Sequence, residues 1–313
     1  MSNDKHPSPK DYAAPQPNDW CAGCGNFGIL RAIQSALAEL ALPPEQVAVF
    51  GGIGCSGKTP YYLATNGIHT LHGRVLPFAQ GARLADPALT VLAVGGDGDG
   101  LSIGAGHFVS APRRNVDLTY ILFNNGVYGL TKGQGAPTLQ QGEQTRSMAV
   151  ATELAGLDPL SLALASGYSW IGRGYAYDVA QLTQLIIGAI RHPGTALLEV
   201  LQPCPTYNDL YTREWYSDTD PETGLPRLYD VADSGHKPLI ADGTAEDEIA
   251  AVRAACFERI LQRDGRIPLG LFLQDCSRPV AAGAVNSPSE AIADDHGKSL
   301  TELSSLLDTL RIG

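Results

Sequence analysis

The sequence is short of positive charge. Its 22 Lys and Arg residues are outnumbered by 33 Asp and Glu residues, which gives the 313-residue chain a net charge of -11. Nucleic acids and anionic membrane surfaces attract proteins through clustered positive charge. The charge balance therefore argues against either as the main partner. A small acidic electron carrier would also be repelled by most of such a surface.

Long hydrophobic runs are missing as well. Even the most apolar stretches, such as residues 182–190, are much shorter than the ~20 residues that span a bilayer. The polar, proline-rich start of the chain has neither the apolar core of a signal peptide nor the arginine-rich pattern of a transit peptide. We therefore expect a cytoplasmic protein without a membrane partner, in which residues 1–19 form a flexible N-terminal arm.

The middle of the chain has the pattern of an α/β protein. Short apolar runs alternate with helical stretches, which predicts a mostly parallel sheet flanked by helices on both faces. The clearest strands are residues 47–53, 89–95, 116–123 and 196–201, and residues 168–172 add a candidate edge strand. The clearest helices are residues 26–40, 101–113 and 179–191, the last behind a possible Asp178 cap.

The character of the chain changes after residue 209. A polar, proline-broken stretch runs to residue 242, and Thr244 and Asp247 then resemble a capping box at the start of a helix. A strand-like segment, residues 269–273, and a leucine-rich helix over residues 300–310 follow. We divide the chain into the arm 1–19, a core domain 20–209 and a C-terminal arm 210–313 that packs on the core or on a partner.

Polar loops follow two neighbouring strands of the predicted sheet. One contains Asp97 in Gly-Asp-Gly-Asp-Gly, and the other contains Asn125 in Asn-Asn-Gly. Ligands bind beyond the carboxyl ends of parallel strands, and glycine lets phosphate approach the backbone. The Asp97 carboxylate, the Asn125 side-chain carbonyl and the Val127 backbone carbonyl would supply three oxygens to Mg²⁺. Asp99 belongs to the same site or caps the next helix.

The spacing of the two loops makes the site more specific. A single Gly-Asp-Gly is commonly an ordinary turn. Here twenty-five residues separate Gly98 from Asn124, and both motifs close strands. This arrangement resembles the thiamine-diphosphate-binding fingerprint.

Four cysteines are expected at the same edge of the sheet. Cys21 and Cys24 form Cys-x-x-Cys before the first predicted helix, and Cys55 and Cys204 each follow a strand. Without a secretory signal, such cysteines favour ligation or reactivity over a disulfide framework. Four thiolates suit either zinc or an iron–sulfur cluster, so the cysteines alone do not decide between these metals.

Taken together, these segments resemble the beta subunit of the 2-oxoacid:ferredoxin oxidoreductases. The resemblance covers residues 20–209 and depends on Cys21-Ala-Gly-Cys24-Gly, Gly54-Cys55-Ser-Gly-Lys58, Leu71-His72-Gly73-Arg74, Gly96-Asp97-Gly98-Asp99, Asn125-Gly-Val-Tyr128-Gly-Leu-Thr131-Lys132-Gly-Gln134 and Gln202-Pro-Cys204-Pro. It implies Mg²⁺ and thiamine diphosphate beside a [4Fe–4S] cluster on the four cysteines. The residues that it implies for the organic cofactor are Gly54, Ser56, His72, Gly96, Asp97, Gly98, Asp99, Asn125, Val127, Tyr128, Gly129 and Leu130.

The resemblance also implies a reaction and its partners. A 2-oxoacid would be decarboxylated oxidatively with coenzyme A to acyl-CoA and CO₂, while electrons pass from thiamine diphosphate through the cluster to ferredoxin. An alpha subunit would supply the glutamate that activates the cofactor, in an (alpha-beta)2 assembly, so this chain alone would not be a complete catalyst. Lys58 and Lys132 are candidates for binding substrate carboxylates, which favours 2-oxoglutarate. His72 and Arg74 contact the diphosphate or cap a turn.

Two other functions remain open. A non-oxidative thiamine-diphosphate decarboxylase or synthase that carries structural zinc would have the same cofactor motif. A non-catalytic, metal-binding interaction subunit would keep the fold and fail to bind thiamine diphosphate.

Overall fold

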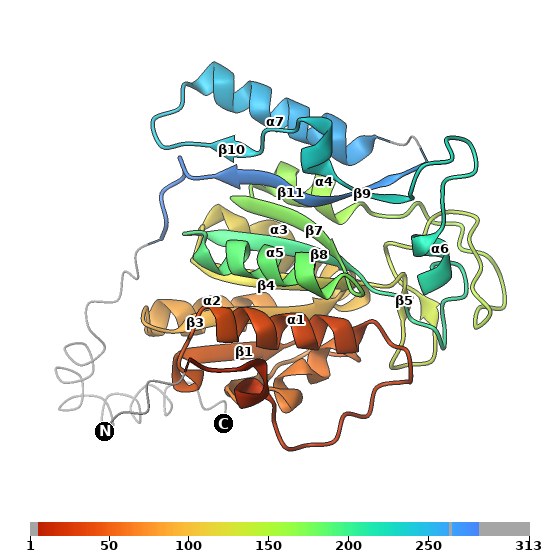
Figure 1. The fold of residues 1–313 in the computed structure, drawn as a ribbon, viewed down its shortest axis with the longest axis horizontal. Helices are drawn as coiled ribbons and strands as arrows, with labels where there is room; N and C mark the ends of the chain where they lie inside the picture. The colour runs from red at the N-terminus through yellow and green to blue at the C-terminus, as the bar shows by residue number, and fades with distance from the viewer. Residues whose placement is uncertain (1–5, 263–264, 282–313) are drawn as a thin grey trace, which may run out of the picture.

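A nine-stranded sheet forms the centre of the computed structural model, which describes residues 6–262 and 265–281 (Figure 1). The strand order is β10-β11-β7-β8-β4-β3-β1-β2, and β9 pairs with β11 beside this path. Among the described strand pairs of this sheet, only β11–β7 is antiparallel. The strands are β1 (Val47–Gly51), β2 (Asn66–His69), β3 (Thr90–Gly96), β4 (Leu118–Asn124), β7 (Trp170–Tyr175), β8 (Thr195–Leu201), β9 (Leu228–Asp230), β10 (Leu239–Ile240) and β11 (Ile267–Asp275).

The central strands are apolar at consecutive positions because both faces of the sheet are buried. In β4, Leu118, Tyr120 and Leu122 pack into the core on one face, while Ile121 and Phe123 pack into the core on the other. Strands covered by helices on both faces need this pattern. The four strands predicted over residues 47–53, 89–95, 116–123 and 196–201 are confirmed as β1, β3, β4 and β8, which lie side by side.

Helices cover both faces, as predicted. α1 and α5 contribute to one core, and α2, α3, α4 and α7 contribute to the other; Figure 1 shows α1 and α5 in front of the sheet. The predicted cap of α5 is confirmed, because the Asp178 carboxylate accepts a hydrogen bond from the backbone N–H of Gln181 (3.0 Å). The helices are α1 (Asn26–Glu39), α2 (Val75–Ala85), α3 (Ala105–Ser110), α4 (Pro159–Ser166), α5 (Val179–Arg191), α6 (Arg213–Ser217) and α7 (Glu246–Leu261).

Two local expectations are wrong. Residues 101–113 do not form one helix: a π-helical turn (Asp99–Ile103), α3 and a 3₁₀ turn (Ala111–Arg113) follow one another. Residues 168–172 do not mark an edge strand, because β7 lies between β8 and β11. Its outer side is covered by a strand that arrives almost one hundred residues later in the chain, and no local pattern indicates such a pairing.

The described part of the C-terminal segment belongs to the sheet and to one of the helical layers that pack on it. β11 extends the sheet beyond β7, and α7 packs against β11 and α4. The described part of the predicted C-terminal arm therefore packs on the core, and the domain boundary at residue 210 stays a prediction. The capping box is also wrong, because α7 begins after Ala245 and the Thr244 hydroxyl donates to the carbonyl of Ala241 (2.8 Å). The helix predicted over residues 300–310 lies outside the described residues.

The described part of the N-terminal segment is packed, where we expected a flexible arm. Residues Pro9–Tyr12 form a 3₁₀ turn, and Ala13 forms a β-bridge with Leu63. Tyr12 is fully buried, and its hydroxyl donates to the carbonyl of Leu42 (2.6 Å). The buried Tyr12 ring and the bridge to Leu63 hold this part of the polar segment against the core.

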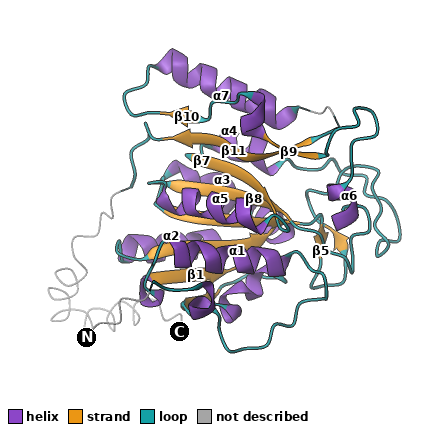
Figure 2. Ribbon diagram, viewed as in Figure 1, coloured by secondary structure: helices purple, strands orange, loops and turns teal. Residues whose placement is uncertain are grey.

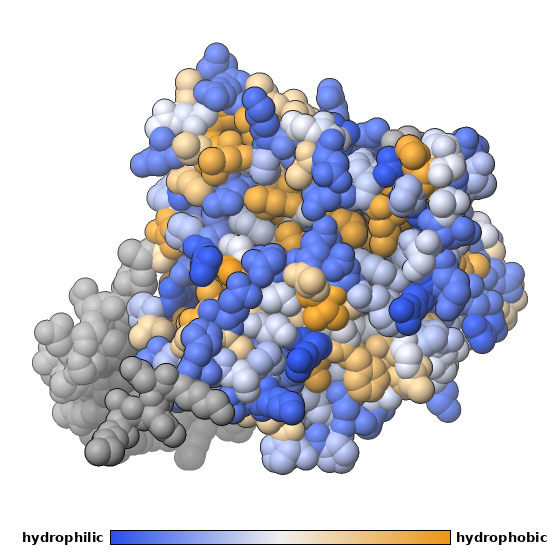
Figure 3. All heavy atoms as spheres, in the orientation of Figure 1, coloured by the Kyte–Doolittle hydropathy of each residue, from blue (hydrophilic) through white to orange (hydrophobic). Residues whose placement is uncertain are grey.

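Figure 3 shows one face of the molecular surface. On this face, hydrophobic side chains lie in separate patches among hydrophilic ones, and one patch lies beside α7 and β10. Among the described residues, no helix is both long and apolar enough to cross a membrane.

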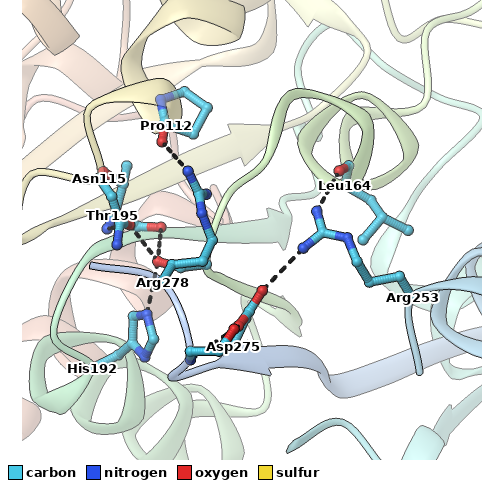
Figure 4. Close-up of polar contacts among 10 residues, drawn as sticks. Pro112, Asn115, Leu164, His192, Thr195, Arg253, Asp275 and Arg278 are labelled. Carbon is cyan, nitrogen blue, oxygen red and sulfur yellow. Dashed lines mark hydrogen bonds and ion pairs between the residues drawn. The ribbon is translucent and has the colours of Figure 1, made fainter. Parts of the chain in front are cut away.

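The amino ends of the parallel strands are joined by a network of buried polar groups (Figure 4). The Ser169 hydroxyl donates to the side-chain carbonyl of Asn115 (2.7 Å), and the backbone N–H of Thr195 donates to the same oxygen (3.0 Å). Asp275, at the end of β11, forms an ion pair with Arg253 of α7 (3.0 Å). The network thus ties the C-terminal strand and α7 to the core.

Candidate functional site

A cavity of about 210 Å³ opens at the carboxyl ends of β1, β3 and β4. All twelve residues that the resemblance implies for the organic cofactor line it, together with Ile53, Cys55 and Thr131. Figure 2 shows long loops gathered at this side of the molecule, near the small hairpin of β5 (Val127–Tyr128) and β6 (Gln134–Gly135). The fold therefore brings the expected residues to one place.

Asp97 lies at the inner wall of this cavity and is almost fully buried, with 1% of its surface exposed. Its carboxylate accepts hydrogen bonds from the backbone N–H of Gly126 (3.0 Å) and from the hydroxyl of Thr138 (2.5 Å). Burial raises the pKa of Asp97 to about 6, against the lowering effect of these hydrogen bonds. A bound cation would stabilise the charged form. Thr138 was not predicted, because it returns to the site from a long loop that has no motif.

The Asn125 side chain is held by neighbours on both of its polar atoms. Its Oδ1 accepts from the backbone N–H of Val127 (3.0 Å), and its Nδ2 donates to Oε1 of Gln202 (2.7 Å). Asn208 donates from Nδ2 to the backbone carbonyl of Asn125 (2.8 Å). The loop after β4 is thus fixed from the loop after β8.

Asp99 joins three loops around the cavity. Its Oδ1 accepts from the backbone N–H groups of Ile53 (3.0 Å) and Gly73 (2.7 Å) and contacts Nδ1 of His72 (2.8 Å). Asp99 lies in the first turn of the π-helical segment, yet its carboxylate bonds to the other loops. Arg74 lies outside the cavity lining and donates to the carbonyl of Ile103 (3.0 Å), so it caps a turn.

The four candidate cysteines come from three loops at the same edge of the sheet. Cys55 lines the cavity itself. A Cβ placed on Gly129 would stand 3.6 Å from Sγ of Cys204 and 3.8 Å from Sγ of Cys55, so both sulfurs flank this residue. Cys24 is tied to the loop after β8, because the N–H of Gly25 donates to the carbonyl of Pro203 (3.1 Å).

The thiols of these cysteines influence one another electrostatically. Burial and, to a smaller extent, negative charge on Cys204, Cys55 and Cys21 raise the pKa of Cys24 to about 12. Burial likewise raises the pKa of Cys204 and Cys55, and charge on other cysteines of the set adds to this effect. Such thiols would ionise only beside positive charge, as at a metal centre.

The spacing of these groups bears on the kind of metal. Within residues 6–262 and 265–281, no three His, Cys, Asp or Glu side chains lie close enough together to hold a single metal ion. An iron–sulfur cluster places its thiolates on separate iron atoms, whereas zinc binds all four sulfurs at ~2.3 Å. Four cysteines by themselves do not decide between zinc and an iron–sulfur cluster.

The candidate substrate lysines lie outside the cavity lining. The Lys58 ammonium forms an ion pair with Asp19 (2.7 Å), and this hydrogen bond raises the pKa of Lys58. Lys132 is exposed and adopts a left-handed conformation (φ 78°) in the turn that follows Gly129. The motifs in the sequence place both lysines near the cofactor loops. They could not show that Lys58 pairs with Asp19.

The residues fit a diphosphate with a divalent cation. Asp97 and Asn125 offer one carboxylate oxygen and one amide oxygen at the same cavity wall. Gly98 packs directly against Tyr128 of the same cavity, because a Cβ at this position would collide with the Tyr128 ring.

Comparisons with known proteins cover nearly the whole chain. Residues 46–200 match the family described as thiamine pyrophosphate enzyme, C-terminal TPP binding domain, and residues 204–287 match the C-terminal family of the pyruvate ferredoxin oxidoreductase beta subunit. The 2-oxoacid:ferredoxin oxidoreductase subunit beta of Saccharolobus solfataricus is 44% identical over 307 residues, which cover 94% of this chain and 97% of that one. The chain belongs to the family of 2-oxoacid:ferredoxin oxidoreductase beta subunits. The resemblance predicted from the sequence is thereby confirmed.

Other members of the family carry narrower names. The 2-oxoglutarate oxidoreductase subunit KorB of Mycobacterium tuberculosis is 45% identical over 200 residues, covering 64% of this chain and 54% of that one. A solved structure of the 2-oxoglutarate:ferredoxin oxidoreductase from Magnetococcus marinus, with 2-oxoglutarate, coenzyme A and succinyl-CoA bound, has a TM-score of 0.78 and 33% identity, covering 98% of this chain and 97% of that one. This chain is thus a subunit of an oxidoreductase with an alpha-subunit partner, and its TPP-binding domain holds every residue that lines the cavity.

Proposed function

We propose that this beta subunit binds Mg²⁺-thiamine diphosphate and a [4Fe–4S] cluster, and that its enzyme oxidatively decarboxylates a 2-oxoacid. One observation carries the proposal. The loops that bear Asp97 and Asn125 line a cavity whose wall includes Cys55, and the other three cysteines are close enough to influence its thiol or one another. The bound thiamine diphosphate and the iron–sulfur cluster would therefore be neighbours.

Asp97 and Asn125 would hold the metal, with the Val127 backbone carbonyl as a third oxygen. The Thr138 hydroxyl and the Gly126 N–H keep the Asp97 carboxylate in one orientation. Asp99 keeps the loops at Ile53 and Gly73 together at the other side of the cavity. Bound thiamine diphosphate supplies the carbanion chemistry that releases CO₂ from a 2-oxoacid and retains two electrons.

Cys21, Cys24, Cys55 and Cys204 would hold the cluster, which supplies a one-electron acceptor beside the organic cofactor. Trp20 is buried, and its indole N–H donates to the backbone carbonyl of Cys55 (2.8 Å). This contact would hold the backbone at Cys55 in place beside the cluster. Electrons would leave this edge of the chain toward ferredoxin.

The complete reaction would need surfaces beyond this chain. The proposed assembly is (alpha-beta)2, in which the alpha subunit supplies the activating glutamate and coenzyme A accepts the acyl group. The net charge of -11 would oppose an acidic ferredoxin, so a local basic patch or the partner subunit would form the docking surface.

Replacing Asp97 by Ala tests the cofactor site. The variant loses the one charged metal ligand, so Mg²⁺-dependent affinity for thiamine diphosphate should fall about 100-fold when measured by calorimetry on the complex with its alpha subunit. Asp86→Ala is the control, because Asp86 is exposed at the end of α2. Unchanged affinity in Asp97→Ala would remove the basis of the site.

Metal analysis of anaerobically purified protein tests the cluster. Iron with sulfide, and visible absorption that dithionite bleaches, is the expected result. Colourless protein with one zinc per chain would instead favour a structural metal site. Anaerobic handling matters because exposed clusters are lost by oxidation.

For the substrate, we propose 2-oxoglutarate, a 2-oxoacid with a second carboxylate. Two relatives with this substrate in their names support the choice, and Lys132 lies exposed beside the cavity loop of residues 127–131. The Lys132→Ala complex should lose about tenfold in kcat/KM for 2-oxoglutarate and much less for pyruvate. Lys237→Ala, another exposed lysine, should change neither. Equal losses for both substrates would exclude a role for Lys132 in binding the distal carboxylate.

A further inference from the structure

One buried side chain contacts both candidate cofactor sites. Gln202 directly follows β8 and has only 2% of its surface exposed. Its Oε1 accepts from Nδ2 of Asn125 (2.7 Å), and its Nε2 donates to Sγ of Cys24 (3.5 Å). Gln202 therefore lies between a candidate magnesium ligand and a candidate cluster ligand.

The orientation of each amide in this chain of contacts is determined by its neighbours. Nε2 of Gln202 also donates to the carbonyl of Pro203 (2.6 Å), so a flipped Gln202 amide would place two oxygens against each other. Oδ1 of Asn125 accepts from the N–H of Val127, so a flipped Asn125 amide would place two donors against each other. Gln202 thus helps to decide that Asn125 presents its oxygen.

The surrounding backbone leaves Gln202 little freedom. A Cβ placed on Gly25 would stand 2.9 Å from Cγ of Gln202 and 3.3 Å from Cδ of Pro203, so the side chain packs directly on the Gly25 backbone. The backbone N–H of Gln202 donates to the carbonyl of Asn124 (2.8 Å). The loops that carry Cys24 and Asn125 are therefore both in contact with this one residue.

We propose that Gln202 is a positioning residue that couples the metal–diphosphate site to the cluster. The inference rests on the function proposed above. Through Oε1, Gln202 holds the Asn125 carbonyl ready for the metal. Through Nε2, it places a hydrogen-bond donor on a cluster thiolate, which stabilises the more negative, reduced cluster and raises its reduction potential.

The coupling acts in both directions. Metal and diphosphate, by fixing Asn125, also fix Gln202 against Cys24, so cofactor binding favours the reduced cluster. By linkage, reduction of the cluster favours cofactor binding by the same factor. A tenfold effect on affinity corresponds to about 59 mV in a one-electron potential.

The test uses Gln202→Met in the complete complex with its alpha subunit. Mg²⁺-dependent affinity for thiamine diphosphate is measured by calorimetry, and the cluster potential by an EPR-monitored redox titration with and without the cofactor. The affinity should fall about tenfold, and the potential of the cofactor-bound enzyme should fall by up to about 59 mV. The control is Gln80→Met, because Gln80 is also buried and donates to the carbonyl of Ala111 (2.9 Å), away from both sites. It should change neither quantity.

A second variant separates the two ends of the side chain. Gln202→Glu, studied at pH 8, keeps an oxygen that accepts from Asn125 and loses the donor toward Cys24. Its affinity for the cofactor should stay within about threefold of the original, while its cluster potential falls. An unchanged potential in this variant, or in Gln202→Met an unchanged affinity or potential, would overturn the coupling.

The two proposals fail in different ways. If the unmodified complex lacks iron or does not bind thiamine diphosphate, the proposed function is wrong. If it has both and the Gln202 variants match the Gln80 control, the proposed function stands and the coupling by Gln202 is wrong.

Discussion

The two ends of the parallel sheet both bury polar side chains, but they satisfy them differently. At the amino ends, Asn115, Ser169 and Thr195 bond to one another and to neighbouring backbone, so the chain supplies most of the partners. At the carboxyl ends, Asp97 faces a cavity, and buried cysteine thiols have pKa values raised by burial and by one another.

This difference indicates how the two ends are used. Buried polar groups that bond within the chain stabilise the native arrangement. Groups whose charged forms are disfavoured in the free chain become stable when a cation or metal centre arrives. We therefore expect changes at the amino ends to affect folding, and changes at the carboxyl ends to affect ligand binding at nearly constant stability.

The largest expected effect is at the carboxyl ends. Cys204→Ser removes one of the four proposed thiolate ligands, so the anaerobically purified complex should lose most of its iron and at least about 100-fold in ferredoxin reduction. Affinity for Mg²⁺-thiamine diphosphate should change less than about threefold. Calorimetry, iron analysis and a ferredoxin assay measure these quantities.

Cys256→Ala is the matched control for Cys204→Ser. Cys256 is a residue of α7 and is fully buried in the core, away from the four candidate ligand cysteines. Its replacement should lower the free energy of unfolding and leave the iron content unchanged. Full ferredoxin reduction by Cys204→Ser would exclude Cys204 as a cluster ligand and weaken the contrast between the two ends.

At the amino ends of the strands, we expect substitutions to affect folding and not cofactor binding. Asp275→Ala leaves Arg253 without its carboxylate partner and removes the acceptor for the Ser277 hydroxyl (2.6 Å). The free energy of unfolding, measured with urea, should fall by about 2 kcal/mol, because the Asp275 carboxylate is buried while Arg253 is 28% exposed and keeps contact with water. Cofactor affinity of the folded complex should not change.

Asp233→Ala is the control here, because Asp233 is exposed in the turn Val231–Ser234. Its effect on unfolding should be within about 0.5 kcal/mol. If Asp275→Ala weakened cofactor binding as strongly as it weakened folding, the two ends would not be independent.

The sequence was most informative about the carboxyl ends. In a parallel sheet, loops that follow neighbouring strands meet at one edge, so locating the strands was enough to bring Asp97, Asn125, Cys55 and Cys204 together. The family resemblance then identified which residues of these loops line the cavity. The roles of these residues toward metal and cofactor remain predictions.

The amino ends and the side-chain contacts could not be predicted in the same way. The position of β11 depends on its pairing with β7, which lies about one hundred residues earlier in the chain. The residue pattern of β11 does not indicate which strand it pairs with. Thr138 belongs to no motif, and Gln202 was part of a motif only beside Cys204, so the sequence did not show that they bond to Asp97 and Asn125. The described part of the N-terminal segment was expected to be flexible because its composition is polar, and the buried Tyr12 could not be foreseen from that composition.

The smallest expected effect concerns pH and again distinguishes the two ends. His192 is 1% exposed at the amino ends; its Nε2 lies 2.8 Å from the Ser169 hydroxyl, and its Nδ1 has no partner among the described residues. Burial lowers the pKa of His192 to about 4, from an ordinary value of 6.5. The unfolded chain therefore binds this proton first as the pH falls, so the stabilising contribution is complete above pH 6.5 and is lost between pH 6.5 and 4.

Urea unfolding at several pH values measures this contribution. Between pH 6.5 and 4 the unmodified chain should lose on the order of 2 to 3 kcal/mol more than His192→Gln, because the Gln side chain takes up no proton. His69→Gln, at an exposed position of β2, should keep the pH dependence of the unmodified chain. If His192→Gln showed the same pH dependence of unfolding as the unmodified chain, His192 would not be the group responsible for it. If Mg²⁺ and thiamine diphosphate at pH 5 stabilised His192→Gln and the unmodified chain by different amounts, the amino ends would be coupled to the cofactor site.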